Sequence, residues 1–99
     1  MPPLTPAEMT RGEVFALLSV TTYWRSLPTI VNRAHEIQKE RGEFSESAEV
    51  LRQPLNITTI RDSLARLVAG GYVERRNVGG QPRYRWQLTG KGLDLRGEL

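Results

Sequence analysis

The pair Gly70-Gly71 separates two kinds of hydrophobic periodicity, and this change limits the possible folds more than any other feature. Before the pair, Asn56 is a suitable N-cap for a helix. The apolar residues that follow recur on one face of that helix, namely Ile57, Ile60, Leu64, Leu67 and Val68. After the pair, apolar and polar residues alternate, which is typical of a half-buried strand. The sequence therefore predicts a helix over 57–69 that leads directly into β structure.

Two strands are predicted after the glycines, over 72–77 and 82–88, with a tight glycine-containing turn at 78–81. Two sets of side chains alternate along the second strand, Tyr84, Trp86 and Leu88 on one face and Arg83, Arg85 and Gln87 on the other. We expect helices to cover the aromatic face. The arginine face is then free for solvent or a ligand, and a short final helix or a tail follows the strand.

Two further helices are predicted in the first half of the chain. Thr10 and Glu13 form a capping box ahead of apolar residues, which predicts a helix over 10–22. Ser26-Leu27-Pro28 is a suitable start for the second helix because proline is tolerated in a first helical turn. Gly42 is a natural stop for this helix.

A chain of 99 residues has enough apolar surface for one core, so we expect one small α+β domain. It has three or four helices and a two-stranded β-hairpin. The predicted organisation is an N-terminal arm over 1–9, a folded domain over 10–93 and a C-terminal tail over 94–99. The segment 43–54 is either a loop or a loop that contains one short helical turn.

Basic residues are concentrated in the second half of the chain. Residues 1–50 carry five basic and seven acidic side chains, whereas residues 51–99 carry nine basic and four acidic ones. From Arg75 to Lys91 there are five basic residues and no acidic residue. Such asymmetry indicates a basic face directed toward a polyanion. A solvated surface that is rich in arginine is the alternative interpretation of the charge alone.

Several kinds of chemistry lack the residues they need. The absence of cysteine excludes disulfides, thiolate metal sites and thiol catalysis. His35 is the single histidine and is expected to be exposed, so we expect no metal, no cofactor and no enzymatic activity. No apolar run reaches the roughly 20 residues that cross a bilayer. The first residues lack the basic and apolar regions of a signal peptide, so we expect no membrane association and a cytoplasmic location.

The order of two helices, an amphipathic helix, Gly-Gly and an arginine-bearing hairpin resembles the winged helix-turn-helix of DNA-binding regulators. Residues 59–76 are similar to the recognition helix and first wing strand of that superfamily. Residues 79–92 are similar to the wing and the Thr-x-x-Gly ending of the PadR-like group. The resemblance covers roughly residues 10–93 and implies a small homodimeric transcriptional repressor. It places helix 57–69 in the major groove of double-stranded DNA and hairpin 75–85 on the backbone or in the minor groove.

The candidate DNA contacts are the polar residues of the amphipathic helix and the arginines of the hairpin: Thr58, Thr59, Arg61, Asp62, Ser63, Arg66, Arg75, Arg76, Arg83 and Arg85. A single helix fits the major groove, which is about 12 Å wide. Thr58 and Thr59 lie in the first turn, where helix-turn-helix proteins approach the bases. Asp62 is expected to orient Arg66 through an i,i+4 pair rather than to contact a base.

Members of the resembled family dimerise through a long C-terminal helix, and this sequence ends at Leu99. We therefore expect the dimer interface at the first helix and its flanks, with the residues Leu4, Phe15, Leu18, Tyr23 and Trp24. The alternative is that these residues complete the core of one chain. Tyr23-Trp24 could also line a pocket for a small effector, but packing is the favoured interpretation.

Two other functions stay open at this stage. One is a plasmid or phage protein that binds a partition or replication site, because such proteins use equally small winged helices. The other is a winged-helix module that binds an acidic protein partner and does not bind DNA.

Overall fold

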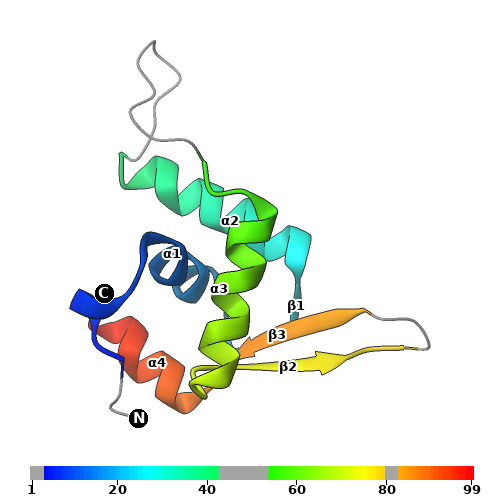
Figure 1. Ribbon diagram of the computed structural model, residues 1–99. Helices are drawn as coiled ribbons and strands as arrows, with labels where there is room; N and C mark the ends of the chain where they lie inside the picture. Colours follow the sequence, from blue (N-terminus) through cyan, green and yellow to red (C-terminus); the bar gives the residue numbers. More distant parts are fainter. Residues whose placement is uncertain (1–3, 43–53, 80–82) are drawn as a thin grey trace.

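A computed structural model describes residues 4–42, 54–79 and 83–99. These residues form the 3-10 helix η1 (Pro6–Glu8), the α-helices α1 (Arg11–Ser19), α2 (Leu27–Glu40), α3 (Ile57–Ala69) and α4 (Gly90–Gly97), and the strands β1 (Arg25–Ser26), β2 (Val73–Asn77) and β3 (Tyr84–Leu88) (Figure 1). The strands make one antiparallel sheet in the order β1-β3-β2. The fold is α+β, as predicted, and the hairpin β2-β3 extends away from the helices (Figure 1).

The predicted starts of α1 and α3 are confirmed by their capping interactions, whereas α2 begins after Ser26 without a side-chain cap. The Thr10 side chain accepts a hydrogen bond from the Glu13 backbone N–H, and the Glu13 carboxylate accepts one from the Thr10 backbone N–H. The Asn56 side chain accepts a hydrogen bond of 2.8 Å from the Thr59 backbone N–H at the start of α3. Each cap satisfies helical N–H groups that have no partner within the helix.

The ends of α2 and α3 agree with the prediction, whereas the end of α1 does not. After α2 and α3, Gly42 and Gly71 have φ angles of 73° and 82°, which favour glycine and end the helices near the predicted positions. However, α1 ends at Ser19, earlier than the predicted residue 22, because Val20 is already extended. The chain then runs toward β1.

Strand β1 is an element that the sequence analysis did not predict. Arg25 pairs with Trp86 and Ser26 pairs with Arg85, so β3 becomes the central strand of the sheet. Two residues are too few to show an alternating pattern. The extended conformation here accompanies the pairing with β3 and has no local sequence signal.

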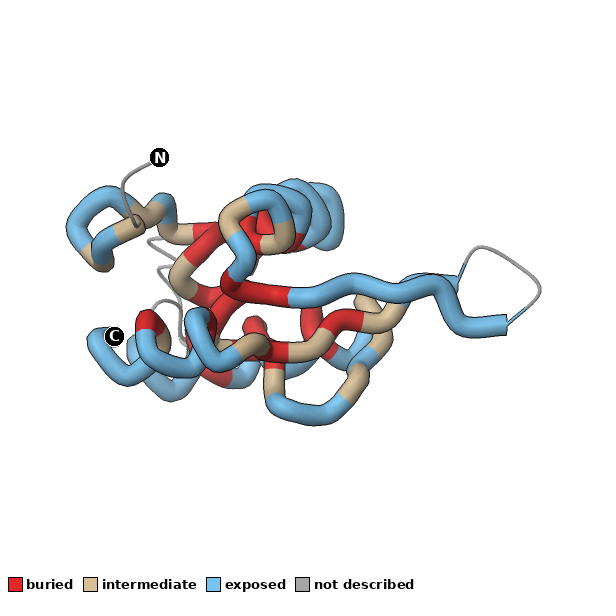
Figure 2. The backbone as a smooth tube through the Cα atoms, turned by 90° about the horizontal axis from the view of Figure 1, so that it is seen from below, coloured by how far each residue is buried: buried red, intermediate tan, exposed pale blue. Residues whose placement is uncertain are grey.

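The core lies between α1, α2, α3 and the proximal half of the sheet (Figure 2). Its buried apolar residues are Phe15, Ala16, Leu17, Val20, Ile30, Val31, Ala34, Ile37, Leu55, Ile60, Leu64, Leu67, Tyr72, Val73, Trp86, Leu88 and Leu95. Figure 2 shows that burial ends where the hairpin leaves the helices. The distal hairpin is therefore held mainly by its own backbone ladder.

The buried face of α3 differs from the predicted face. Ile57 is 49% exposed, whereas Ser63 is fully buried. The cause lies on α1, where Gly12 has no side chain and allows close approach. A Cβ at Gly12 would lie 2.5 Å from the Ser63 Oγ. This contact turns the Ser63 side of α3 toward the core and turns Ile57 outward.

Three further predictions concern the loop, the histidine and the C-terminus. The segment 43–54 lies outside the described residues except for Pro54. His35 is half-buried, not exposed, because its Nε2 lies 2.6 Å from the Leu55 carbonyl oxygen at the entry to α3. The predicted boundary between residues 93 and 94 falls inside α4, and Leu95 on this helix joins the core.

Candidate nucleic-acid interface

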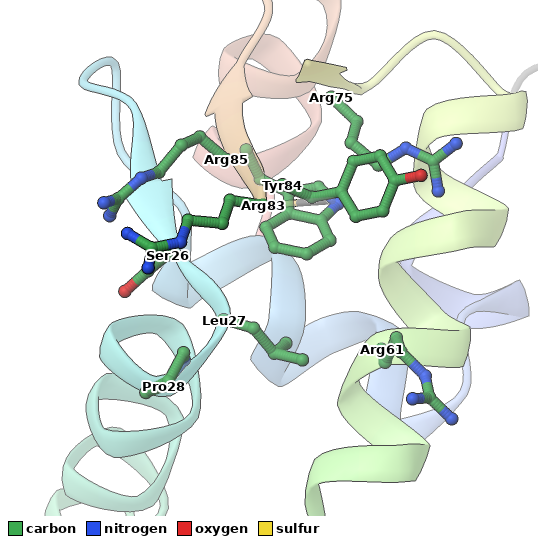
Figure 3. Close-up of a pocket in the computed structure, with 9 residues that line it drawn as sticks. Ser26, Leu27, Pro28, Arg61, Arg75, Arg83, Tyr84 and Arg85 are labelled. Atoms are coloured by element: carbon green, nitrogen blue, oxygen red, sulfur yellow. The ribbon is translucent and has the colours of Figure 1, made fainter. Parts of the chain in front are cut away.

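A groove with a volume of about 450 Å³ lies between the start of α2, α3 and the hairpin (Figure 3). Four arginines line it, namely Arg61 on α3, Arg75 on β2, Arg83 just before β3 and Arg85 on β3. In Figure 3, Arg61 lies across the groove from Pro28 at the start of α2. Segments far apart in the sequence therefore bring cations to one concave surface.

The strand register places Arg75 on the same face of the hairpin as Tyr84 and Trp86, which also line the groove. Arg75 is paired with Trp86 and Asn77 with Tyr84, so Arg75 lies on the aromatic face of the hairpin. The Arg75 guanidinium lies 4.5 Å from the centre of the Tyr84 ring (Figure 3). The expectation that helices cover Tyr84 is wrong, since the ring is 41% exposed. The hairpin extends past the helices at this point (Figure 1).

Arg76 lies on the opposite face of the hairpin. It is paired directly with Arg85, and its guanidinium lies 4.6 Å from the centre of the Trp24 ring. The register thus places Arg75 on one face of the hairpin and Arg76 with Arg85 on the other. The sequence pattern had assigned a face only to Arg83 and Arg85. Like charges that are directly opposite on two strands are destabilising. The hairpin therefore concentrates positive charge at some expense of stability.

No described carboxylate forms an ion pair with the four groove arginines. Arg66 differs from them, because its Nε lies 3.6 Å from an oxygen of Glu13, whose side chain is only 9% exposed. The prediction that Asp62 orients Arg66 is wrong, since Arg66 is turned toward α1 by this buried carboxylate. The positive charge of the groove is therefore available to an external anion.

The predicted contacts on α3 differ in their exposure to solvent. Thr58, Arg61 and Asp62 are exposed together on the outer face. Thr59 is half-buried, with its methyl group near Gly12. Ser63 is buried against α1 and cannot contact DNA, which corrects the prediction. The rotation of α3 that buries Ser63 thus also decides which polar residues remain on the surface.

The residues predicted to form a dimer interface differ in how far they are buried. Phe15 is 4% exposed and belongs to the core of one chain, so its assignment to a dimer interface is wrong. Leu4 and Leu18 are partly buried against the same core. Trp24 is half-buried near Arg76, and Tyr23 is 70% exposed. Most of this apolar surface is therefore used within the chain.

The start of α2 also belongs to the site, although no motif in the sequence indicates this role. Ser26, Leu27 and Pro28 line the groove, and the Ser26 Oγ lies 3.0 Å from the Thr29 Oγ1. The residues Ser26-Leu27-Pro28 predicted where α2 begins. Its position opposite α3 depends on the tertiary fold.

Comparisons with protein-family models, with curated proteins and with solved structures give no match. Within the described residues, no helix has the length and apolar character needed to span a membrane. The same residues include no group of three acidic or histidine side chains that could hold a metal ion. The assignment of the site therefore depends on its geometry and charge.

Proposed function

We propose that this chain is a winged-helix protein that binds duplex DNA and acts as a small transcriptional regulator. The observation that carries the proposal is the groove with four arginines and no carboxylate partner among the described residues. A cationic groove attracts the phosphate backbone, which supplies most of the affinity of a DNA-binding protein. The element order α1-β1-α2-α3-β2-β3 supports the winged-helix interpretation.

In this proposal α3 supplies the contacts to the bases. The helix has 13 residues, which corresponds to a length of roughly 20 Å. Thr58, Arg61 and Asp62 face solvent on this helix. Arginine can bond two acceptors of guanine, and a carboxylate can accept from cytosine. Arg61 is the residue that belongs to both the outer face of α3 and the groove.

The hairpin and the start of α2 supply the contacts to the backbone. Arg75, Arg83 and Arg85 line the groove next to the first turn of α2. Helix N-termini and arginines are both common phosphate ligands in protein–DNA complexes.

The test measures binding to a labelled random-sequence duplex by fluorescence anisotropy at several salt concentrations. Each phosphate contact contributes about 0.9 to the slope of log K against log salt. Alanine at both Arg75 and Arg83, which the proposal assigns to the backbone, should therefore weaken binding and lower the slope by up to about 2. Arg41→Ala is the matched control, because Arg41 is exposed at the far end of α2.

Two results would contradict the proposal. One is the absence of salt-dependent binding by the folded wild-type chain, which is expected of a module that binds only an acidic protein. The other is an equal slope for the double variant and the wild type. Selection from a random duplex library then tests sequence specificity. Enrichment of one motif supports a regulatory role, whereas retention without enrichment contradicts it.

A further inference from the structure

Strand β2 lies at the edge of the sheet, because the strand order is β1-β3-β2. No described element runs along its outer side (Figure 1). We propose that this edge pairs with β2 of a second copy of the chain, which joins two sheets into one. The proposal concerns a surface separate from the arginine groove and does not depend on DNA binding.

The pattern of hydrogen bonds between β2 and β3 determines which backbone groups of β2 have no partner in the sheet. The Val78 N–H donates to the Arg83 carbonyl at 2.7 Å, and the Thr89 N–H donates to the Tyr72 carbonyl at 3.2 Å. Hydrogen-bonded and non-hydrogen-bonded pairs alternate along an antiparallel ladder. The even-numbered residues of β2 therefore bond to β3. The odd-numbered residues 73, 75 and 77 direct their N–H and C=O groups to the free edge.

One antiparallel register uses all of these free groups. With a two-fold axis at Arg75, the two Arg75 residues pair with each other, and Val73 pairs with Asn77 of the second copy. Glu74 then lies opposite Arg76 of the second copy, and the symmetry repeats this pair. In this register Glu74 and Arg76 occupy non-hydrogen-bonded pairs, where side chains approach most closely. Opposite charges in such cross-strand pairs are stabilising.

The central Arg75 pair would bring like charges together, but the structure separates the guanidiniums. Each Arg75 lies over the Tyr84 ring at 4.5 Å. Because Tyr84 belongs to β3, the guanidinium leans across the sheet and away from the free edge. The Arg76 guanidinium also leans toward an aromatic ring, since it lies 4.6 Å from the centre of the Trp24 ring. Glu74 and Arg76 are complementary in charge in this register, and Arg76 would move from Trp24 to Glu74 of the second copy on pairing.

An apolar contact also fits this register. A hollow of about 510 Å³ lies beside β2 and is lined by the apolar residues Trp24, Val68 and Val73 and by the charged residues Glu74, Arg75 and Arg76, among others. Val78 at the other end of the strand is 36% exposed. In the proposed register Val78 of the second copy lies opposite Tyr72, next to this hollow. Both ends of the paired strands would then bury apolar surface.

The choice of a second copy, rather than another strand, follows from the charges. Charged side chains on an edge strand oppose pairing with most other strands. In β2 the acidic and basic residues instead complement their own symmetry mates, as in an isologous interface. A two-fold axis perpendicular to the sheet keeps both α3 helices on the same side of the joined sheet. Two grooves could then face one duplex.

A charge exchange tests the pairing by sedimentation velocity over a wide range of protein concentration. The wild type should associate to a dimer as concentration rises. Glu74→Arg should be monomeric, because positions 74 and 76 would then repel each other, and Arg76→Glu should be monomeric for the same reason. An equimolar mixture of the two single variants should regain association, because every pair across the axis is again of opposite charge.

Matched controls separate this result from general charge effects. Glu98→Arg and Arg41→Glu carry the same charge changes at exposed positions outside β2 and should associate as the wild type does. Far-UV circular dichroism should show all variants folded. A monomeric wild type at every concentration overturns the proposal. So does a mixture that stays monomeric, or a single variant that dimerises like the wild type; the latter result would point to association through another surface.

Discussion

The helical body and the distal hairpin are stabilised in different ways. In the body, α1, α2 and α3 bury a continuous set of apolar side chains, and Leu17, Ile30 and Leu64 have no exposed surface. Among the residues of β2 and β3, Val73, Trp86 and Leu88 are buried, Arg85 and Gln87 are half-buried, and the others are exposed. The body therefore determines stability. The hairpin is free to carry unpaired positive charge because few core contacts depend on it.

The largest expected effect is a loss of stability in the body. Leu67 on α3 is fully buried, so Leu67→Ala should lower the free energy of unfolding by about 2–5 kcal/mol through lost burial and a cavity. Urea unfolding followed by circular dichroism measures this change. A loss below about 1 kcal/mol would mean that α3 packs less tightly than its burial indicates. The proposed DNA binding should be unchanged in the folded fraction, since Leu67 does not line the groove.

A second effect tests the close approach of α1 and α3. Gly12→Ala should destabilise the fold by about 1–3 kcal/mol, because the new methyl group meets the Ser63 Oγ. Ser63→Ala removes this oxygen, so the double variant should be more stable than the sum of the two single changes predicts. Urea unfolding of all four proteins gives the coupling. Additive changes would show that the two positions do not contact each other.

These two regions also differ in how much could be predicted from sequence. The starts of α1 and α3 are local events, specified by Thr10 and Asn56, and both predictions are confirmed. The burial of Ser63 could not be predicted from α3 alone, because it depends on Gly12 of another helix. The two residues of β1 likewise become a strand by pairing with β3.

The same distinction applies to the candidate site. Composition and spacing indicated a basic hairpin, and the arginines were named from the sequence alone. Which of them share a surface depends on the strand register, which places Arg75 beside Tyr84 and Arg76 on the other face. Arg66 has the same residue type, but the buried carboxylate of Glu13 directs it away from the groove. Residue type can be read from sequence, whereas partners require the fold.

The smallest expected effect is on the stability of the hairpin. Arg76→Ala removes the contact with Trp24, which for an exposed pair is worth about 0.5–1 kcal/mol. It also removes the repulsion from the directly paired Arg85, which is of similar size and opposite sign. The free energy of unfolding should therefore change by less than about 0.5 kcal/mol.

The salt dependence of stability shows whether the Arg76–Trp24 contact and the Arg76–Arg85 repulsion cancel or are both absent. Added salt screens the repulsion between exposed charges, so the wild type should become relatively more stable than Arg76→Ala as salt is raised. Arg41→Ala, which has no arginine directly opposite it on a neighbouring strand, should show no such relative change. An Arg76→Ala protein that follows the wild type at every salt concentration would mean that the charge of the hairpin imposes no stability penalty. The helical body and the distal hairpin would then differ in stability through burial alone.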